Sequence, residues 1–189
     1  MPTYLALGDS MSIDDYTGVT GGGAVNQFFA DLDDEWTLDD RTSDGCRMQH
    51  VATDATGDLI TLTIGGNDLL WNREEYLARG LDGFAARHWE LLTAIRKANQ
   101  AALLIVGDIY RPDAKLTERE SESLDAANRV IRSNCLRVGA QLAPIHRTFR
   151  GHEQDYLCFQ IEPTLAGAKA IANLFRSAFE ENRMDAIEP

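Results

Sequence analysis

A serine follows directly on the first short apolar run of the chain, in the order Gly8-Asp9-Ser10. A serine at a sharp strand exit can present its hydroxyl as a nucleophile, beside free backbone N–H groups that stabilise developing negative charge. The same residue types are also common in plain turns. This tripeptide alone therefore leaves a nucleophile and a simple turn both open.

Two further loops offer hydrogen-bond donors to a developing oxyanion. The segment Gly65-Gly66-Asn67-Asp68 follows the third apolar run, and its glycines allow close backbone approach while Asn67 supplies an amide N–H. The loop Ser43-Asp44-Gly45-Cys46 adds the backbone N–H of Gly45. Each loop is also compatible with an ordinary turn or helix cap. Their convergence on one edge of a sheet is the stronger indication of a site.

Short apolar runs alternate with longer helix-like patterns along the chain. The predicted strands are residues 3–7, about 36–38, 59–64, 101–106 and 141–145, and the predicted helices are 23–32, 47–53, 83–99, 117–138 and 163 to about 181. Thr117 and Glu120 form a capping-box pattern, and Pro163 suits the first turn of the last helix. This alternation predicts a doubly wound parallel sheet that binds ligands beyond the carboxyl ends of its strands. Residues 182–189 are expected to fray.

The three loops resemble the first three blocks of the SGNH, or GDSL-type, hydrolases. The resemblance runs in element order from Thr3 to about Phe175. It implies one α/β domain over residues 1–189, a flavodoxin-like three-layer α/β/α sandwich with a five-stranded parallel sheet, that hydrolyses an ester, acetyl or thioester group. It also implies that Ser10 is the nucleophile and that the Ser10 N–H, the Gly45 N–H and the Asn67 amide form the oxyanion hole. The absence of a G-x-S-x-G sequence argues against the ordinary α/β-hydrolases.

The last block of that family departs from its usual pattern in this chain. Family members place an Asp and, three residues later, a His before the final helix, but Phe159 and Glu162 stand at these positions here. A serine hydroxyl needs a base within hydrogen-bond reach. We expect His152, on the loop before the last helix, to be this base, with Glu162 orienting it. The alternative makes Glu162 itself the base, which requires burial to raise its pKa.

Composition limits the partners that this chain is expected to have. The chain has 189 residues, a formal net charge of −12 and a sequence pI near 4.7, which disfavour binding to nucleic acid. Three cysteines without C-x-x-C spacing argue against a disulfide framework and a thiolate zinc site. Neither a signal peptide nor a long apolar run is visible, so no membrane association and a cytoplasmic location are expected. The oligomeric state stays open.

The leading hypothesis is a serine esterase that cleaves a small acyl ester, such as an acetylated sugar, without a cofactor or metal. A second hypothesis is a degenerate binding protein that keeps the fold and the cleft but has lost turnover. A third is a metal- or carboxylate-based phosphatase or glycosidase that uses Asp9, Asp14 and Asp15. Trp71 and Tyr110, each just after a predicted strand, are expected to line the substrate mouth.

Overall fold

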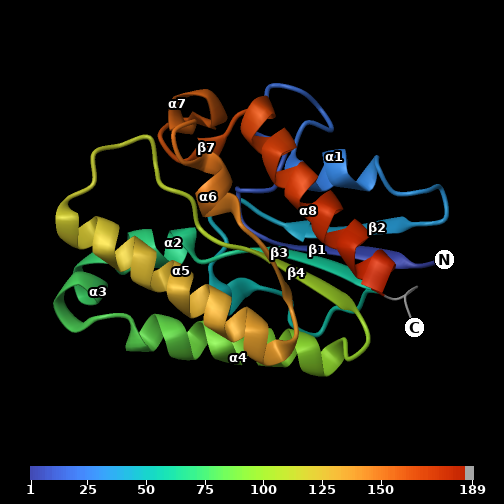
Figure 1. The fold of residues 1–189 in the computed structure, drawn as a ribbon, viewed down its shortest axis with the longest axis horizontal. Helices are drawn as coiled ribbons and strands as arrows, with labels where there is room; N and C mark the ends of the chain where they lie inside the picture. Colours follow the sequence, from blue (N-terminus) through green and yellow to red (C-terminus); the bar gives the residue numbers. More distant parts are fainter. Residues whose placement is uncertain (186–189) are drawn as a thin grey trace.

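The computed structural model of this protein, which describes residues 1–185, contains a five-stranded parallel sheet (Figure 1). The strands are β1 (Thr3–Gly8), β2 (Thr37–Thr42), β3 (Leu59–Thr63), β4 (Leu103–Gly107) and β5 (Gln141–Ala143). Their order across the sheet is β2-β1-β3-β4-β5. The predicted α/β fold is therefore confirmed, and the carboxyl end of β1 lies between those of β2 and β3.

Four helices cover the sheet. They are α1 (Ala24–Phe29), α4 (Asp82–Ala98), α5 (Glu118–Val138) and α8 (Leu165–Asp185). Helices α4 and α5 pack on one face, and α1 and α8 pack on the other, which gives three layers (Figure 1). No helix in the described part of the chain is long and apolar enough to cross a membrane.

Alternating side chains of the central strands supply the two cores. Leu5 and Leu7 of β1 are buried in the cluster beneath α4 and α5, whereas Tyr4 and Ala6 are buried in the cluster beneath α1 and α8. Successive side chains of a strand point to opposite faces, so a strand covered on both sides is apolar throughout. This explains why the central strands were visible in the sequence as continuous apolar runs.

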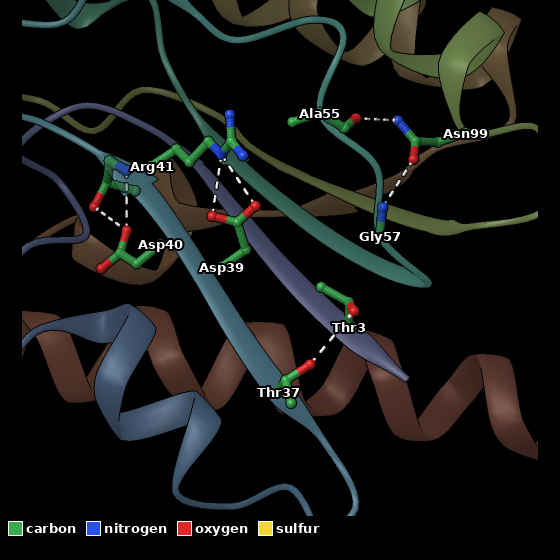
Figure 2. Close-up of polar contacts among 9 residues, drawn as sticks. Thr3, Thr37, Asp39, Asp40, Arg41, Ala55, Gly57 and Asn99 are labelled. Carbon is green, nitrogen blue, oxygen red and sulfur yellow. Dashed lines mark hydrogen bonds and ion pairs between the residues drawn. The ribbon is translucent and has the colours of Figure 1, made fainter. Parts of the chain in front are cut away.

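The edge strand β2 is longer than its sequence predicted. Only residues 36–38 were expected, because the rest of Thr37–Thr42 is polar. At the edge of the sheet these polar side chains bond to one another: Arg41 Nε donates to both carboxylate oxygens of Asp39 at 3.0 Å (Figure 2). Charged side chains are a common feature of sheet edges. An edge strand therefore does not need the apolar run that marks a buried one.

Side-chain hydrogen bonds fix the loop before β3 and the first turn of α5. Asn99, after α4, donates through Nδ2 to the Ala55 carbonyl oxygen and accepts from the Gly57 N–H, both at 3.0 Å, which holds the loop before β3 (Figure 2). The predicted capping box of α5 is confirmed: the Thr117 N–H donates to Glu120 Oε2 at 2.7 Å and the Glu120 N–H to Thr117 Oγ1 at 3.3 Å.

Several short elements between the long ones were not predicted or were placed differently. They are η1 (Met48–His50), where a longer helix was expected, and α2 (Gly66–Trp71), α3 (Arg73–Arg79), α6 (Ile145–Phe149), α7 (Glu153–Tyr156), β6 (Leu157–Cys158) and β7 (Glu162–Pro163). Pro163 belongs to β7, and α8 begins at Leu165, not at Pro163. Residues 182–185 of the tail expected to fray belong to α8, and residues 186–189 lie outside the described residues.

Replacing Gly8 by alanine is expected to lower the free energy of unfolding by about 2–4 kcal/mol. Gly8 has a φ of +129°, and a Cβ there would lie 1.9 Å from the Thr63 carbonyl oxygen, which accepts the Asp9 N–H at 2.9 Å. Gly18→Ala is the control, because Gly18 also has a positive φ (+72°) but no atom within 4 Å of an added Cβ. Urea unfolding of both variants tests this, and equal losses would contradict the steric argument.

Candidate functional site

The end of β1 places Ser10 in the lining of a pocket. Gly8 is the last residue of β1, and the hydrogen bond from the Asp9 N–H to the Thr63 carbonyl oxygen ties the strand exit to β3. Ser10 is 8% exposed and lines the pocket together with its neighbours Asp9 and Met11. A hydroxyl in this position is accessible to a ligand while its backbone is held by the sheet.

The other two loops predicted from the sequence meet beside this serine. Asn67 lies in the first turn of α2 and lines the same pocket as Ser10. Its Nδ2 donates to the Cys46 carbonyl oxygen at 3.1 Å, next to Gly45, and the Ser43 N–H donates to the Gly8 carbonyl oxygen at 3.0 Å. These bonds join the Gly45 loop to both α2 and β1.

The donors expected for an oxyanion hole are available in this arrangement. Among residues 1–185, neither the Ser10 N–H nor the Gly45 N–H has a hydrogen-bond acceptor. Gly45 has a φ of +68°, in the left-handed region that glycine adopts without strain. Asn67 Nδ2 carries two hydrogens, and the bond to Cys46 occupies one of them. Each predicted group thus keeps an N–H for a ligand.

Glu162 is the titratable side chain whose pKa is affected by the Ser10 hydroxyl. It lies in the two-residue strand β7, opposite Cys158 of β6, and is 7% exposed. Burial raises the pKa of its carboxyl, the nearby Ser10 hydroxyl lowers it, and the Asp44 carboxylate raises it, with a net rise. Its Oε2 atom is buried without a hydrogen-bond partner among the described residues. A buried carboxylate with a raised pKa is a stronger base than an exposed one.

The structure does not bring His152 together with Ser10. His152 is exposed at the start of α7, and its ring stacks on Tyr156 with centroids 5.1 Å apart. Two further ring contacts, Tyr156 with Phe149 and Phe149 with Tyr110, separate it from the pocket of Ser10, which Tyr110 lines. His152 instead lines a polar hollow beside residues 111–115. His152 is near the last family block in the sequence, but this does not place it near Ser10 in the structure.

The remaining histidines are accounted for by packing or lie at the surface. His88 is fully buried between α4 and α5, where its Nδ1 lies 3.2 Å from Asn134 Nδ2 and burial lowers its pKa to about 4. His146 is buried with its Nδ1 2.6 Å from Asn128 Nδ2, and His50 is exposed. None of the four lines the pocket of Ser10.

Two carboxyl groups beside the serine are buried, although sequence reasoning named Asp9 only for a metal- or carboxylate-based site and gave Asp68 no role. Asp9 is 1% exposed; burial raises its pKa to about 8, the Met11 N–H lowers it, and the carboxylates of Glu162 and Asp68 raise it. Asp68 is 4% exposed and accepts the Met48 N–H at 3.1 Å, and burial raises its pKa as well. The sequence signal was only their place next to Ser10 and Asn67, because burial of a turn residue is not visible in a single sequence.

The pocket beside Ser10 has a cavity volume of about 140 Å³ and mostly apolar walls. Its apolar side chains come from α2, α3, the start of α5 and the segment after β4: Leu69, Leu70, Leu77, Ile109, Tyr110, Pro112, Leu116 and Leu124, with Met11 and Ile161. Arg73 and Glu120 form an ion pair at 2.5 Å among the lining residues. Tyr110 lines this pocket as predicted. Trp71 does not: it is 74% exposed, with the Arg47 guanidinium 5.7 Å from its ring.

The acidic pair after the serine loop has a structural role at Asp14. Its carboxylate accepts the N–H groups of Gly21 at 2.6 Å and Gly23 at 2.7 Å, and the Asn26 amide at 2.9 Å. Burial alone would raise the pKa of Asp14, but these three bonds lower it overall. In the described part of the chain, no group of three His, Cys, Asp or Glu side chains has the geometry of a metal site. Asp14 therefore organises the loop that leads into α1.

Solved structures with the same fold include several ester hydrolases. The lipase Lip_vut3 from a goat rumen metagenome is 20% identical with a TM-score of 0.75, and the match covers 94% of this chain and 97% of that one. Phospholipase A1 from Streptomyces albidoflavus is 18% identical with a TM-score of 0.66, covering 94% and 99%. The acetylxylan esterase Axe2 from Geobacillus stearothermophilus is 14% identical with a TM-score of 0.73, covering 94% and 93%. At these identities the likeness establishes the fold.

A family assignment follows from the sequence match. A comparison with curated proteins gave no match. Residues 6–170 match the sequence model of the GDSL-like lipase/acylhydrolase family, in agreement with the resemblance of the three loops. The matched range includes Ser10, Gly45, Asn67 and Glu162. The chain therefore belongs to the GDSL-like lipase/acylhydrolase family of hydrolases.

Proposed function

We propose that this protein is a serine ester hydrolase in which Glu162, and not a histidine, is the base. The observation that carries the proposal is the buried Glu162 carboxyl, whose pKa the hydroxyl of Ser10 lowers, beside a serine that lines an apolar pocket. A serine with a base in reach, beside free N–H donors, is the arrangement that nucleophilic acyl transfer requires. His152 does not line that pocket and has no part in the proposed reaction.

The proposed reaction has two halves. Glu162 takes the proton of the Ser10 hydroxyl as Oγ bonds to the ester carbonyl carbon, and the carbonyl oxygen becomes an oxyanion. The carbon–oxygen bond to the alcohol then breaks, the alcohol leaves with the proton from Glu162, and an acyl-enzyme remains. In the second half a water gives a proton to Glu162 as its oxygen bonds to the acyl carbon. The bond from that carbon to Ser10 Oγ then breaks and Glu162 returns the proton to Oγ, which releases the carboxylic acid and restores Ser10.

The oxyanion is stabilised by three N–H donors. In the proposal these are the backbone N–H groups of Ser10 and Gly45 and the free hydrogen of Asn67 Nδ2. Loss of one such donor slows acyl transfer by about 10²–10³-fold in enzymes of this type. The joined loops after β1, β2 and β3 provide the preorganisation that this effect needs.

The pocket favours an ester with an apolar acyl group longer than acetyl. Its walls are apolar side chains, so each methylene of an acyl chain that enters it gains about 0.8 kcal/mol of transfer free energy. The sugar acetate expected at first would leave these walls unused. Lipases, a phospholipase and an acetylxylan esterase share this fold, so the fold itself does not select among these substrates.

The test is hydrolysis of p-nitrophenyl acetate, butyrate and octanoate by wild type and Ser10→Ala. We expect kcat/KM of wild type to rise with chain length until the pocket is filled, and Ser10→Ala to lose at least about 10³-fold. A fluorophosphonate should label Ser10 and spare Ser12, whose hydroxyl is buried on Thr63 Oγ1 at 2.8 Å. Equal rates and equal labelling for wild type and Ser10→Ala would reject the proposal in favour of a binding protein without turnover.

A further inference from the structure

The turn that carries Glu162 to Ser10 has an unusual backbone. Phe159 and Gln160, between β6 and β7, have φ angles of 49° and 72°, and they are the positive-φ residues other than glycine in the described chain. Side chains other than glycine adopt this region at a cost, so two in succession persist only where neighbouring groups hold them. Phe159 is 80% exposed, so burial of its own ring does not fix the turn.

Hydrogen bonds from the segment after β4 hold this turn. The Tyr110 hydroxyl donates to the Ile161 carbonyl oxygen, and the Asp113 N–H donates to the Gln160 carbonyl oxygen at 2.8 Å. The first bond is made by a side chain, and it ends on the peptide group that joins Ile161 to Glu162. The Tyr110 hydroxyl therefore bonds to the peptide group that leads into Glu162, in addition to the pairing of Glu162 with Cys158.

Tyr110 is itself held rigidly. It is 6% exposed, and its ring stacks on Phe149 with centroids 4.7 Å apart and planes 10° apart. The preceding residue, Ile109, exchanges two hydrogen bonds with the side chain of Asn128 in α5: its N–H donates to Oδ1 at 2.8 Å and its carbonyl oxygen accepts from Nδ2 at 2.7 Å. A fixed side chain can position another group because little freedom is lost when the bond forms.

We propose that Tyr110 is a positioning residue, whose hydroxyl holds the Ile161–Glu162 peptide so that the Glu162 carboxylate stays buried against Ser10. This rests on the proposed function in that Glu162 is the base. Tyr110 does not exchange a proton with the substrate; it acts through Glu162. Its ring also forms part of the pocket wall, so the hydroxyl and the ring have separate roles.

The pKa of the Glu162 carboxyl is expected to show whether this side chain is held in its buried position. The titratable groups that couple to it are Asp9, Asp44, Tyr16, Tyr110 and Cys158. All of these are acids, so burial among them favours the protonated carboxyl. If the hydroxyl of Tyr110 is removed, the Ile161 carbonyl is released and Glu162 becomes more solvated. The pKa of Glu162 should then move down, toward that of an exposed glutamate.

The matched variants are Tyr110→Phe and Tyr156→Phe. Tyr110→Phe keeps the ring stacked on Phe149 and the pocket wall, and removes only the hydroxyl. Tyr156 packs against the same Phe149 at 5.1 Å, and its hydroxyl has no hydrogen-bond partner among the described residues, so Tyr156→Phe makes the same chemical change without touching the turn. A cooperative unfolding transition, measured for each variant by its unfolding temperature, establishes that both variants fold.

The experiment measures kcat and KM for p-nitrophenyl butyrate from about pH 4 to about pH 8. For Tyr110→Phe we expect kcat to fall about 10–100-fold with KM changed less than about threefold, and the acid limb of the kcat profile to move to lower pH. Tyr156→Phe should keep the wild-type values. A purely structural role would lower stability without moving the acid limb. If Tyr110→Phe keeps the wild-type kcat and acid limb, the proposal is wrong while the hydrolase assignment stands.

A second measurement separates this proposal from the proposed function. Carbon-13 NMR of the glutamate carboxyls, with Glu162 assigned by its loss in Glu162→Gln, reports the pKa of Glu162 without turnover. We expect it to fall in Tyr110→Phe and to stay at the wild-type value in Tyr156→Phe. An unchanged titration in Tyr110→Phe overturns the positioning role. Turnover equal in wild type and Ser10→Ala overturns the proposed function instead, whatever the titration shows.

Discussion

Replacing Glu162 by glutamine is expected to lower kcat for ester hydrolysis by about 10²–10⁴-fold with little change in KM. Glutamine has the same shape but cannot take the Ser10 proton, so the nucleophile stays protonated while the apolar pocket still binds the acyl group. His152→Ala should keep the wild-type kcat, because His152 is exposed and stacks on Tyr156 away from the pocket. Steady-state kinetics of the two variants side by side measures this difference.

The pH profile adds a second criterion for the identity of the base. Activity should rise with pH as Glu162 loses its proton, with the acid limb above 4.5 because the pKa of this carboxyl is raised from that value. In the double variant Phe159→Asp/Glu162→His, the acid and the histidine of the family pattern are restored, and the limb should move to about 6.5. Aspartate also suits the left-handed backbone at position 159 better than phenylalanine does. A large loss in His152→Ala with normal activity in Glu162→Gln would reverse the assignment.

The sequence was informative where a residue's role depends on its own strand and turn. The central strands were apolar runs because both faces of the sheet are covered, and Ser10, Gly45 and Asn67 follow β1, β2 and β3 in one parallel sheet. Parallel strands end at the same edge, so local order along the chain predicted a meeting of loops in space. The short helix α2 was missed because its apolar residues Leu69, Leu70 and Trp71 are consecutive and two of them are exposed, so they show no helical period.

The base depended on information that the sequence does not contain. His152 and Glu162 are ten residues apart, and both precede α8, so proximity along the chain did not separate them. The β6–β7 pairing turns Glu162 inward, whereas His152 ends on the outer side of a stack of aromatic rings. The pairing of two-residue strands and the burial of a turn carboxylate are set by tertiary contacts, above all those of Tyr110, and leave no periodic pattern.

Asp9→Asn is expected to stabilise the protein above pH 8, by an amount on the order of 5 kcal/mol. Burial raises the pKa of Asp9 from 3.8 to about 8, so the folded state holds this proton more tightly than the unfolded state does. The contribution of protonated Asp9 to the free energy of unfolding is fully present below about pH 4. It falls as pH rises and is lost above about pH 8. Asparagine cannot ionise, and its Oδ1 can still accept the Met11 N–H, which lies 3.2 Å from the carboxylate in the wild type.

Urea unfolding of wild type and Asp9→Asn at several pH values measures the effect, with the exposed Asp15→Asn as a control that removes the same charge from the surface. His88 works in the opposite sense: burial lowers its pKa from 6.5 to about 4, so it destabilises the fold as pH falls through that window. Because His88 is present in both proteins, the difference between them isolates Asp9. That difference should be near zero at pH 4 and grow toward pH 8. A difference that is constant with pH, or equal to that of Asp15→Asn, would mean that Asp9 is ionised in the folded protein and that its charge is compensated beside Ser10.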